Sequence, residues 1–121
     1  MSFKVIIAGS RDFDNYNLLV EVSDQLLKEE SDIEIVSGTA RGADSLGERY
    51  ALENNYKLTK FPADWSLYGK SAGYRRNVDM GNYADALIAF WDGISKGTKH
   101  MIDIATDKGL RICVIKYKEL Y

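Results

Sequence analysis

Short apolar segments rich in β-branched residues alternate along this chain with segments whose apolar residues recur at helical spacing. Four of the short segments are predicted to be buried strands, because runs of this length are typical of parallel sheets. A fifth segment, Lys57–Phe61, alternates polar with apolar residues, which predicts a strand at the edge of the sheet. The four buried strands are expected at Val5–Ala8, Ile33–Val36, Ala86–Phe90 and Ile112–Ile115.

Four helices are expected between these strands. Asp14 is predicted to cap the first helix, and Gly109 is predicted to stop the last. Gly47 and Gly81 lie inside helical stretches and are interpreted as points of close contact between helix and sheet. The apolar faces are formed in turn by Leu19, Val22 and Leu26, by Ala43, Leu46 and Tyr50, by Tyr74 and Val78, and by Met101, Ile104 and Ala105.

The order of elements predicts an α/β fold. Strands that alternate with helices form parallel sheets with right-handed crossovers and helices on both faces. We therefore expect a Rossmann-like three-layer αβα fold with a five-stranded parallel sheet in the order 3-2-1-4-5. The length of 121 residues predicts a single domain over residues 1–121. The longest irregular segment, Pro62–Lys70, is expected to be a binding loop or lid.

Composition excludes several classes of protein. A formal net charge of −2 argues against strong non-specific binding of nucleic acid, which depends on clustered Lys and Arg. No apolar stretch approaches the roughly 20 residues of a membrane span, and no signal peptide is recognisable. A single cysteine, Cys113, excludes an intramolecular disulfide and is expected in the core. A cytoplasmic protein without a membrane partner is predicted.

The loops after the strands are the expected ligand site, because doubly wound sheets bind ligands beyond the carboxyl ends of their strands. These loops are rich in Gly, Ser, Thr and Lys, and four of the six arginines lie in or just after them: Arg11, Arg41, Arg75 and Arg76. Backbone N–H groups, helix N-termini and guanidinium groups together favour a phosphate-bearing ligand. The alternative is that the glycines only shape tight turns.

One phosphate is expected where Gly9–Arg11, Ser37–Gly38 and Gly97–Thr98 meet, with Arg11 or Arg76 as the counter-charge. The residues predicted to bind a nucleotide or its phosphate are Gly9, Ser10, Arg11, Ser37, Gly38, Arg41, Gly42, Asp44, Asp64, Trp65, Arg76, Asn77, Trp91, Asp92, Gly97 and Thr98.

Four aromatic residues, Trp65, Tyr68, Tyr74 and Trp91, are expected at the same end of the sheet. They are suited to stacking on a base, and equally to a dimer interface or a hydrophobic lid.

Three carboxylates fall in the same loops. Asp44 is expected to favour the helix dipole, whereas Asp64 and Asp92 are candidates for a ribose hydroxyl or a base edge. Pairing of Asp64 or Asp92 with Arg75 or Arg76 is the alternative.

Several well-known motifs are absent. The chain has no GxGxxG or GxxxxGK[ST] pattern, and no HExxH or CxxC pattern, so no metal site and no cofactor are expected. Ser10 and Ser37 have no histidine in a nucleophile pattern. The single histidine, His100, falls on a polar helix face and is expected to be solvated.

The chain resembles the SLOG superfamily, the Rossmann-like group that joins DprA/Smf proteins with LOG-type nucleotide phosphoribohydrolases. It is most similar to the small YspA/YpsA-related branch, often encoded by phages or bacteria. The resemblance implies a nucleotide-derived ligand and self-association into dimers or larger oligomers. The residues that carry it are Gly9–Arg11, Ser37–Asp44, Phe61–Trp65, Gly69–Lys70, Ala72–Gly73, Arg76–Asn77, Met80, Ala84–Asp85, Ala89–Gly93, Ser95 and Gly97–Thr98.

The resemblance also suggests how the chain departs from LOG-type enzymes. Their PGGxGTxxE motif is matched here by Gly97–Thr98, and Arg76 lies where their arginine is expected, but Met101 occupies the glutamate position. A thioether moves no proton, so another carboxylate, Asp92 or Asp64, would have to replace the glutamate, with Arg76 as the third catalytic candidate.

Three functions follow in order of preference. The first is binding of a nucleotide or nucleotide-derived ligand by a sensor or sequestering module. The second is hydrolysis of a nucleotide N-glycosidic bond. The third is DprA-like binding of single-stranded DNA, which the net charge of −2 disfavours.

Overall fold

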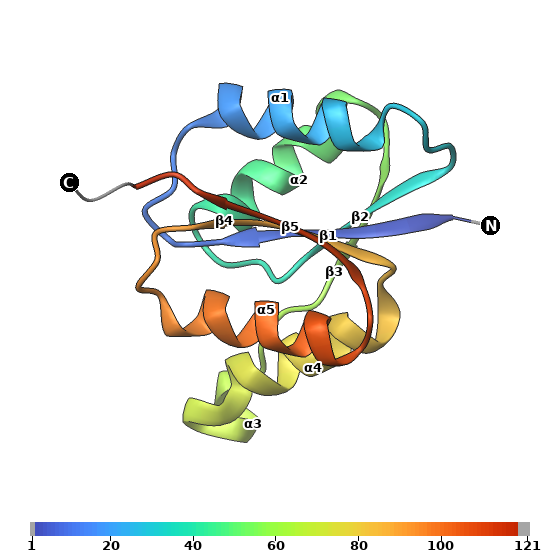
Figure 1. Cartoon of the computed structure of the whole chain (residues 1–121). Helices are drawn as coiled ribbons and strands as arrows, with labels where there is room; N and C mark the ends of the chain where they lie inside the picture. The colour runs from blue at the N-terminus through green and yellow to red at the C-terminus, as the bar shows by residue number, and fades with distance from the viewer. Residues whose placement is uncertain (1, 119–121) are drawn as a thin grey trace.

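The computed structural model describes residues 2–118, and all of its strands belong to one sheet (Figure 1). The elements in chain order are β1 (Phe3–Gly9), α1 (Tyr16–Leu27), β2 (Ile33–Ser37), α2 (Ala43–Glu53), β3 (Lys57–Lys60), α3 (Trp65–Tyr68), the 3₁₀ turn η1 (Gly69–Ser71), α4 (Ala72–Tyr83), β4 (Ala86–Trp91), α5 (Lys96–Asp107) and β5 (Arg111–Lys116).

The sheet is parallel throughout, with the strand order β3-β2-β1-β4-β5. In its centre Val5 of β1 pairs with Ile35 of β2 on one side and Ala86 of β4 on the other. Helices α1 and α2 cover one face and α4 and α5 the other (Figure 1). The predicted three-layer fold and strand order are confirmed, and β3 lies at an edge as its alternating pattern indicated.

Two predictions about helices need correction. Asn15, not Asp14, caps α1, because it directly precedes the helix and its Oδ1 accepts a hydrogen bond from the Leu18 N–H at 3.0 Å. A Cβ at Gly81 would lie 2.5 Å from Cγ2 of Ile104, so this glycine allows α4 to approach α5 rather than the sheet.

Three further expectations of local structure have different outcomes. Gly47 faces Ile7 of β1 at the predicted contact between helix and sheet. The segment expected as an irregular loop, Pro62–Lys70, contains α3, which is too short to show a helical period. Cys113 is only half-buried, because β5 is the second edge strand. Within residues 2–118 no helix is long and apolar enough to cross a bilayer.

Candidate functional site

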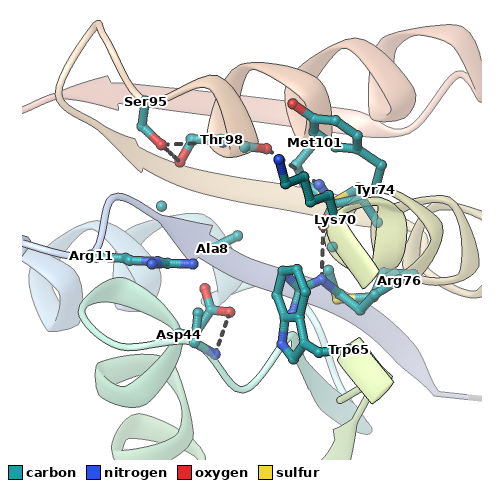
Figure 2. Close-up of a pocket in the computed structure, with 16 residues that line it drawn as sticks. Ala8, Arg11, Asp44, Trp65, Lys70, Tyr74, Arg76, Ser95, Thr98 and Met101 are labelled. Carbon is teal, nitrogen blue, oxygen red and sulfur yellow. Dashed lines mark hydrogen bonds between the residues drawn. The ribbon is translucent and has the colours of Figure 1, made fainter. Parts of the chain in front are cut away.

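A cavity of about 230 Å³ opens at the carboxyl ends of the central strands, between the start of α2, the start of α5 and helix α4 (Figure 2). This is the end of the sheet at which the sequence predicted ligand binding. The residues that line it are Ala8, Gly9, Arg11, Ala40, Asp44, Trp65, Lys70, Gly73, Tyr74, Arg76, Asn77, Met80, Ser95, Gly97, Thr98 and Met101.

Two glycines allow the loops around this cavity to touch. Gly42 has φ +76°, and a Cβ on it would lie 2.3 Å from the carbonyl oxygen of Ser10. A Cβ on Gly38 would lie 2.7 Å from Nη1 of Arg76. A side chain at Gly42 would push the β1 and β2 loops apart, whereas one at Gly38 would displace the guanidinium of Arg76.

Arg76 projects from α4 to the edge of the cavity. Its Nη1 donates to the carbonyl oxygen of Gly38, and its Nε donates to Oδ1 of Asn77 at 3.0 Å. Burial lowers the pKa of the guanidinium, and the carboxylate of Asp44 opposes this shift. The group stays charged, because an ordinary arginine pKa lies far above neutral pH.

Asn77 connects α4 to the first turn of α5. Its buried Nδ2 donates to the carbonyl oxygen of Gly97 at 3.3 Å and lies 3.1 Å from Nδ1 of His100. The ring of His100 also packs against Tyr74, with centroids 4.4 Å apart. The expectation of a freely solvated histidine is therefore wrong, and burial lowers the pKa of His100.

Asp44 is the carboxylate in the lining of the cavity. It belongs to the first turn of α2, is 4% exposed, and its Oδ2 accepts from the Ala40 N–H at 3.1 Å. Burial raises the pKa of Asp44 to about 6, although the Ala40 N–H and the charge of Arg76 both act to lower it. Its environment thus disfavours the ionised form that dominates at neutral pH.

The start of α5 forms the opposite side of the cavity. Ser95 caps the helix, and its Oγ accepts from the Thr98 N–H at 3.5 Å and from the Thr98 hydroxyl at 3.2 Å. Open space surrounds Gly97, so an anion can approach the backbone there. The first N–H groups of any helix have no intrahelical acceptor, which leaves this end suited to an anion.

Some predicted site residues complete turns instead of lining the cavity. Ser10 Oγ accepts from the Asp92 N–H at 3.1 Å, and Asp92 Oδ1 accepts from the N–H groups of Ile94 and Ser95 at 2.8 and 2.7 Å. The Ser95 N–H in particular holds the pKa of Asp92 below its usual value. Asp64 caps α3, accepting from the Leu67 N–H at 3.0 Å.

Other predicted residues lie in neighbouring hollows. Ser37 is buried and donates to Glu48 at 2.7 Å, away from the cavity. Gly38 and Arg41 line an adjoining hollow of about 390 Å³, which shares Arg11, Ala40, Trp65 and Arg76 with the cavity. Trp91 lines a third hollow beside Lys96 and Lys99.

Only two of the four aromatic residues that were expected together line the cavity. Trp65 and Tyr74 line the cavity, and each is about half exposed. Tyr68 instead packs beneath the guanidinium of Arg75, 4.4 Å from its ring centre. Lys70 also lines the cavity, although it was not among the predicted site residues; its place in the glycine-containing loop before α4 was the available signal. Within residues 2–118 no cluster of His, Cys, Asp and Glu is suited to a metal ion.

Comparison with known proteins identifies the family. Residues 3–68, more than half of the chain, match the family described as YspA, cpYpsA-related SLOG. The chain belongs to this SLOG family. This SLOG protein is also 34% identical over 116 residues to the Gene 61 protein of Mycobacterium phage D29, a match that covers 90% of this chain and 93% of that protein.

A solved structure is similar in fold. The X-ray structure of DNA processing protein A (DprA) from Streptococcus pneumoniae matches this SLOG protein with a TM-score of 0.75 at 20% identity. The match covers 99% of this chain but 52% of the DprA chain, so this protein spans about half of that relative. The family match ends at Tyr68, before Arg76, Asn77 and the start of α5 that complete the cavity.

Proposed function

We propose that this SLOG protein binds a nucleotide or nucleotide-derived ligand in the cavity, with a phosphate between Arg11 and the start of α5. The observation that carries the proposal is a set of cations that form no salt bridge with the described residues, although the charge of Asp44 acts on Arg76 from a longer distance. Arg11, Lys70 and Arg76 all line the cavity, and within residues 2–118 none of them takes part in an ion pair. An external anion is the partner that these groups can accept.

The remaining walls suit the rest of a nucleotide. Trp65 stands where the cavity meets the adjoining hollow, and Figure 2 shows its indole ring beside Arg76. An exposed aromatic face of this kind favours stacking of a base, and together the two spaces reach the size of ordinary small-molecule sites. The SLOG family membership supports the same ligand class.

Hydrolysis of an N-glycosidic bond is the second candidate. The observation in its favour is Asp44, a carboxylate inside the cavity with a raised pKa of about 6, near the value that suits acid–base chemistry. Met101, at the position of the LOG-type glutamate, lies in the same cavity and moves no proton. Release of free base from nucleotides at roughly 1 per second or faster would favour hydrolysis over simple binding.

Calorimetric titration of AMP, ADP and ADP-ribose into the protein tests the binding function. Arg11→Ala and Arg76→Ala should each weaken the affinity about 10- to 150-fold, the usual loss for a charge-assisted hydrogen bond. Thr98→Val should weaken it less, because the Thr98 hydroxyl already bonds Ser95 and the helix N-terminus survives.

Arg111→Ala is the matched control, because it removes a cation from the exposed start of β5, at the opposite end of the sheet. Its affinity should equal that of the parent protein. If Arg11→Ala and Arg76→Ala fold and bind as tightly as the control, the phosphate does not lie in this cavity.

A further inference from the structure

The carboxylate of Asp44 places a negative charge at one end of the cavity. Asp44 begins α2, and its Oδ2 accepts from the Ala40 N–H, so the carboxylate takes the place that an external anion would hold at this helix. The start of α5, across the cavity, has no such carboxylate in its first turn. The two helix N-termini that face the cavity therefore differ in the groups they can accept.

This difference orients a nucleotide. A phosphate beside Asp44 would place two anions together in a buried site, where like charges repel strongly. The phosphate must therefore lie toward α5, and the group beside Asp44 must be neutral or a hydrogen-bond donor. In a nucleotide the sugar hydroxyls meet this requirement, because a carboxylate accepts hydrogen bonds and donates none when ionised.

The carboxylate also has acceptor capacity left. Its donors are the backbone N–H groups of Ala40 and Gly9, and no side chain of residues 2–118 donates a hydrogen bond to it. Arg76 uses its Nη1 and Nε on Gly38 and Asn77. Figure 2 shows the second oxygen of Asp44 turned toward the space below Arg11. A carboxylate oxygen that faces a cavity can accept a further hydrogen bond, so a ligand that supplies a donor there gains affinity.

We propose that Asp44 accepts hydrogen bonds from the ribose hydroxyls of the ligand and makes the cavity selective for ribonucleotides over 2′-deoxyribonucleotides. This inference rests on the proposed binding of a nucleotide. It separates the protein from a reader of DNA, because a deoxyribose lacks one of the two hydroxyls that Asp44 would accept. Loss of that donor removes one charge-assisted hydrogen bond from a carboxylate that the ligand also shields from water.

Titration with matched pairs of nucleotides tests the proposal. AMP, GMP, CMP and UMP are each compared with the 2′-deoxy form of the same nucleotide. The parent protein should bind the preferred ribonucleotide about 10- to 150-fold more tightly than its deoxy partner. Asp44→Asn keeps the shape and an acceptor for the Ala40 N–H but replaces a charge-assisted bond to the sugar hydroxyl with a weaker neutral one, so the preference should fall about five- to tenfold.

Asp103→Asn is the matched control, because it removes the same charge from the exposed face of α5. It should keep the parent preference. Equal binding of ribose and deoxyribose forms by the parent overturns the assignment of Asp44 while leaving nucleotide binding intact. Binding of neither form overturns the proposed function itself. An unchanged ribose preference in Asp44→Asn also overturns the assignment.

A second measurement does not depend on folding of the variant. In the parent protein, the ¹³C signal of the Asp44 carboxyl should move clearly further when the ribonucleotide binds than with a saturating amount of the deoxy form, which retains only the 3′-hydroxyl. A signal that moves equally with both, or with neither, contradicts a hydrogen bond from the 2′-hydroxyl to Asp44.

Discussion

Two buried carboxylates lie at opposite ends of this sheet, and the difference between them shows how burial serves two purposes. Glu34, near the start of β2, is 1% exposed, and its Oε2 accepts from the Thr59 hydroxyl at 2.8 Å and from the Tyr83 hydroxyl. Burial acts to raise the pKa of Glu34, but these two hydroxyls and Lys57 outweigh it and hold the pKa below its ordinary value.

Asp44 is similarly shielded from solvent, at 4% exposure, but it lies deeper among protein atoms and receives no comparable set of side-chain donors. Burial therefore dominates and raises its pKa to about 6. Both the deeper position of Asp44 and its lack of side-chain donors separate the two groups. Glu34 stabilises the fold as an ion, whereas the ionised form of Asp44 destabilises it.

Among the variants that test this comparison, Glu34→Leu should change the free energy of unfolding most. The substitution keeps the side-chain volume but leaves the hydroxyls of Thr59 and Tyr83 without their acceptor, so the free energy of unfolding should fall by about 3–5 kcal/mol. Urea denaturation at pH 7.5 measures it. Glu34→Gln retains an acceptor and should lose less than half as much. Equal losses in the two variants would show that the hydroxyls do not depend on this acceptor.

Asp44→Asn should act in the opposite direction. The folded pKa of about 6 lies above the unfolded value of 3.8, so ionisation costs the folded state free energy as pH rises from about 4 to 6, and the whole cost is present above 6. At about 1.4 kcal/mol per pKa unit, less the weaker bond that a neutral amide accepts from Ala40, the variant should gain about 2 kcal/mol at pH 7.5.

The same denaturation series at pH 4 provides the control. There the carboxyl of Asp44 is protonated in the folded protein, so the gain of Asp44→Asn should nearly vanish. A gain of equal size at both pH values would mean that the substitution acts through packing and not through charge. Glu34 has the reverse dependence: its stabilisation is present above its unfolded pKa of about 4.5 and is lost as pH falls through the lower folded value.

The smallest effect is expected from Lys57→Met. The Nζ of Lys57 lies 3.5 Å from Oε1 of Glu34, but its side chain is 69% exposed, and such pairs contribute little. The free energy of unfolding should change by less than about 0.5 kcal/mol, measured by the same urea series. A loss as large as that of Glu34→Gln would mean that Lys57, and not the two hydroxyls, stabilises the carboxylate of Glu34.

Much of the fold could be predicted from the sequence, because a parallel sheet reveals itself through buried β-branched runs, and the alternating pattern of Lys57–Phe61 identified an edge. Which of the candidate carboxylates would line the cavity could not be predicted from the sequence. Asp44 and Asp92 both follow strands, but Asp44 enters the cavity whereas Asp92 is held by the N–H groups of Ile94 and Ser95. Which carboxylate closes a turn and which faces a ligand depends on side-chain direction, and residue order alone does not specify that.

The central place of β1 in the sheet affects how the protein emerges during synthesis. β1 leaves the ribosome first and can pair early with β2, but its other edge pairs with β4, about 50 residues beyond β2. At about 5–20 residues per second this interval lasts roughly 3–10 s, during which one side of an apolar strand presents unpaired N–H and C=O groups. The start of α5 appears later still, so the cavity forms only in chains that have passed through this aggregation-prone interval.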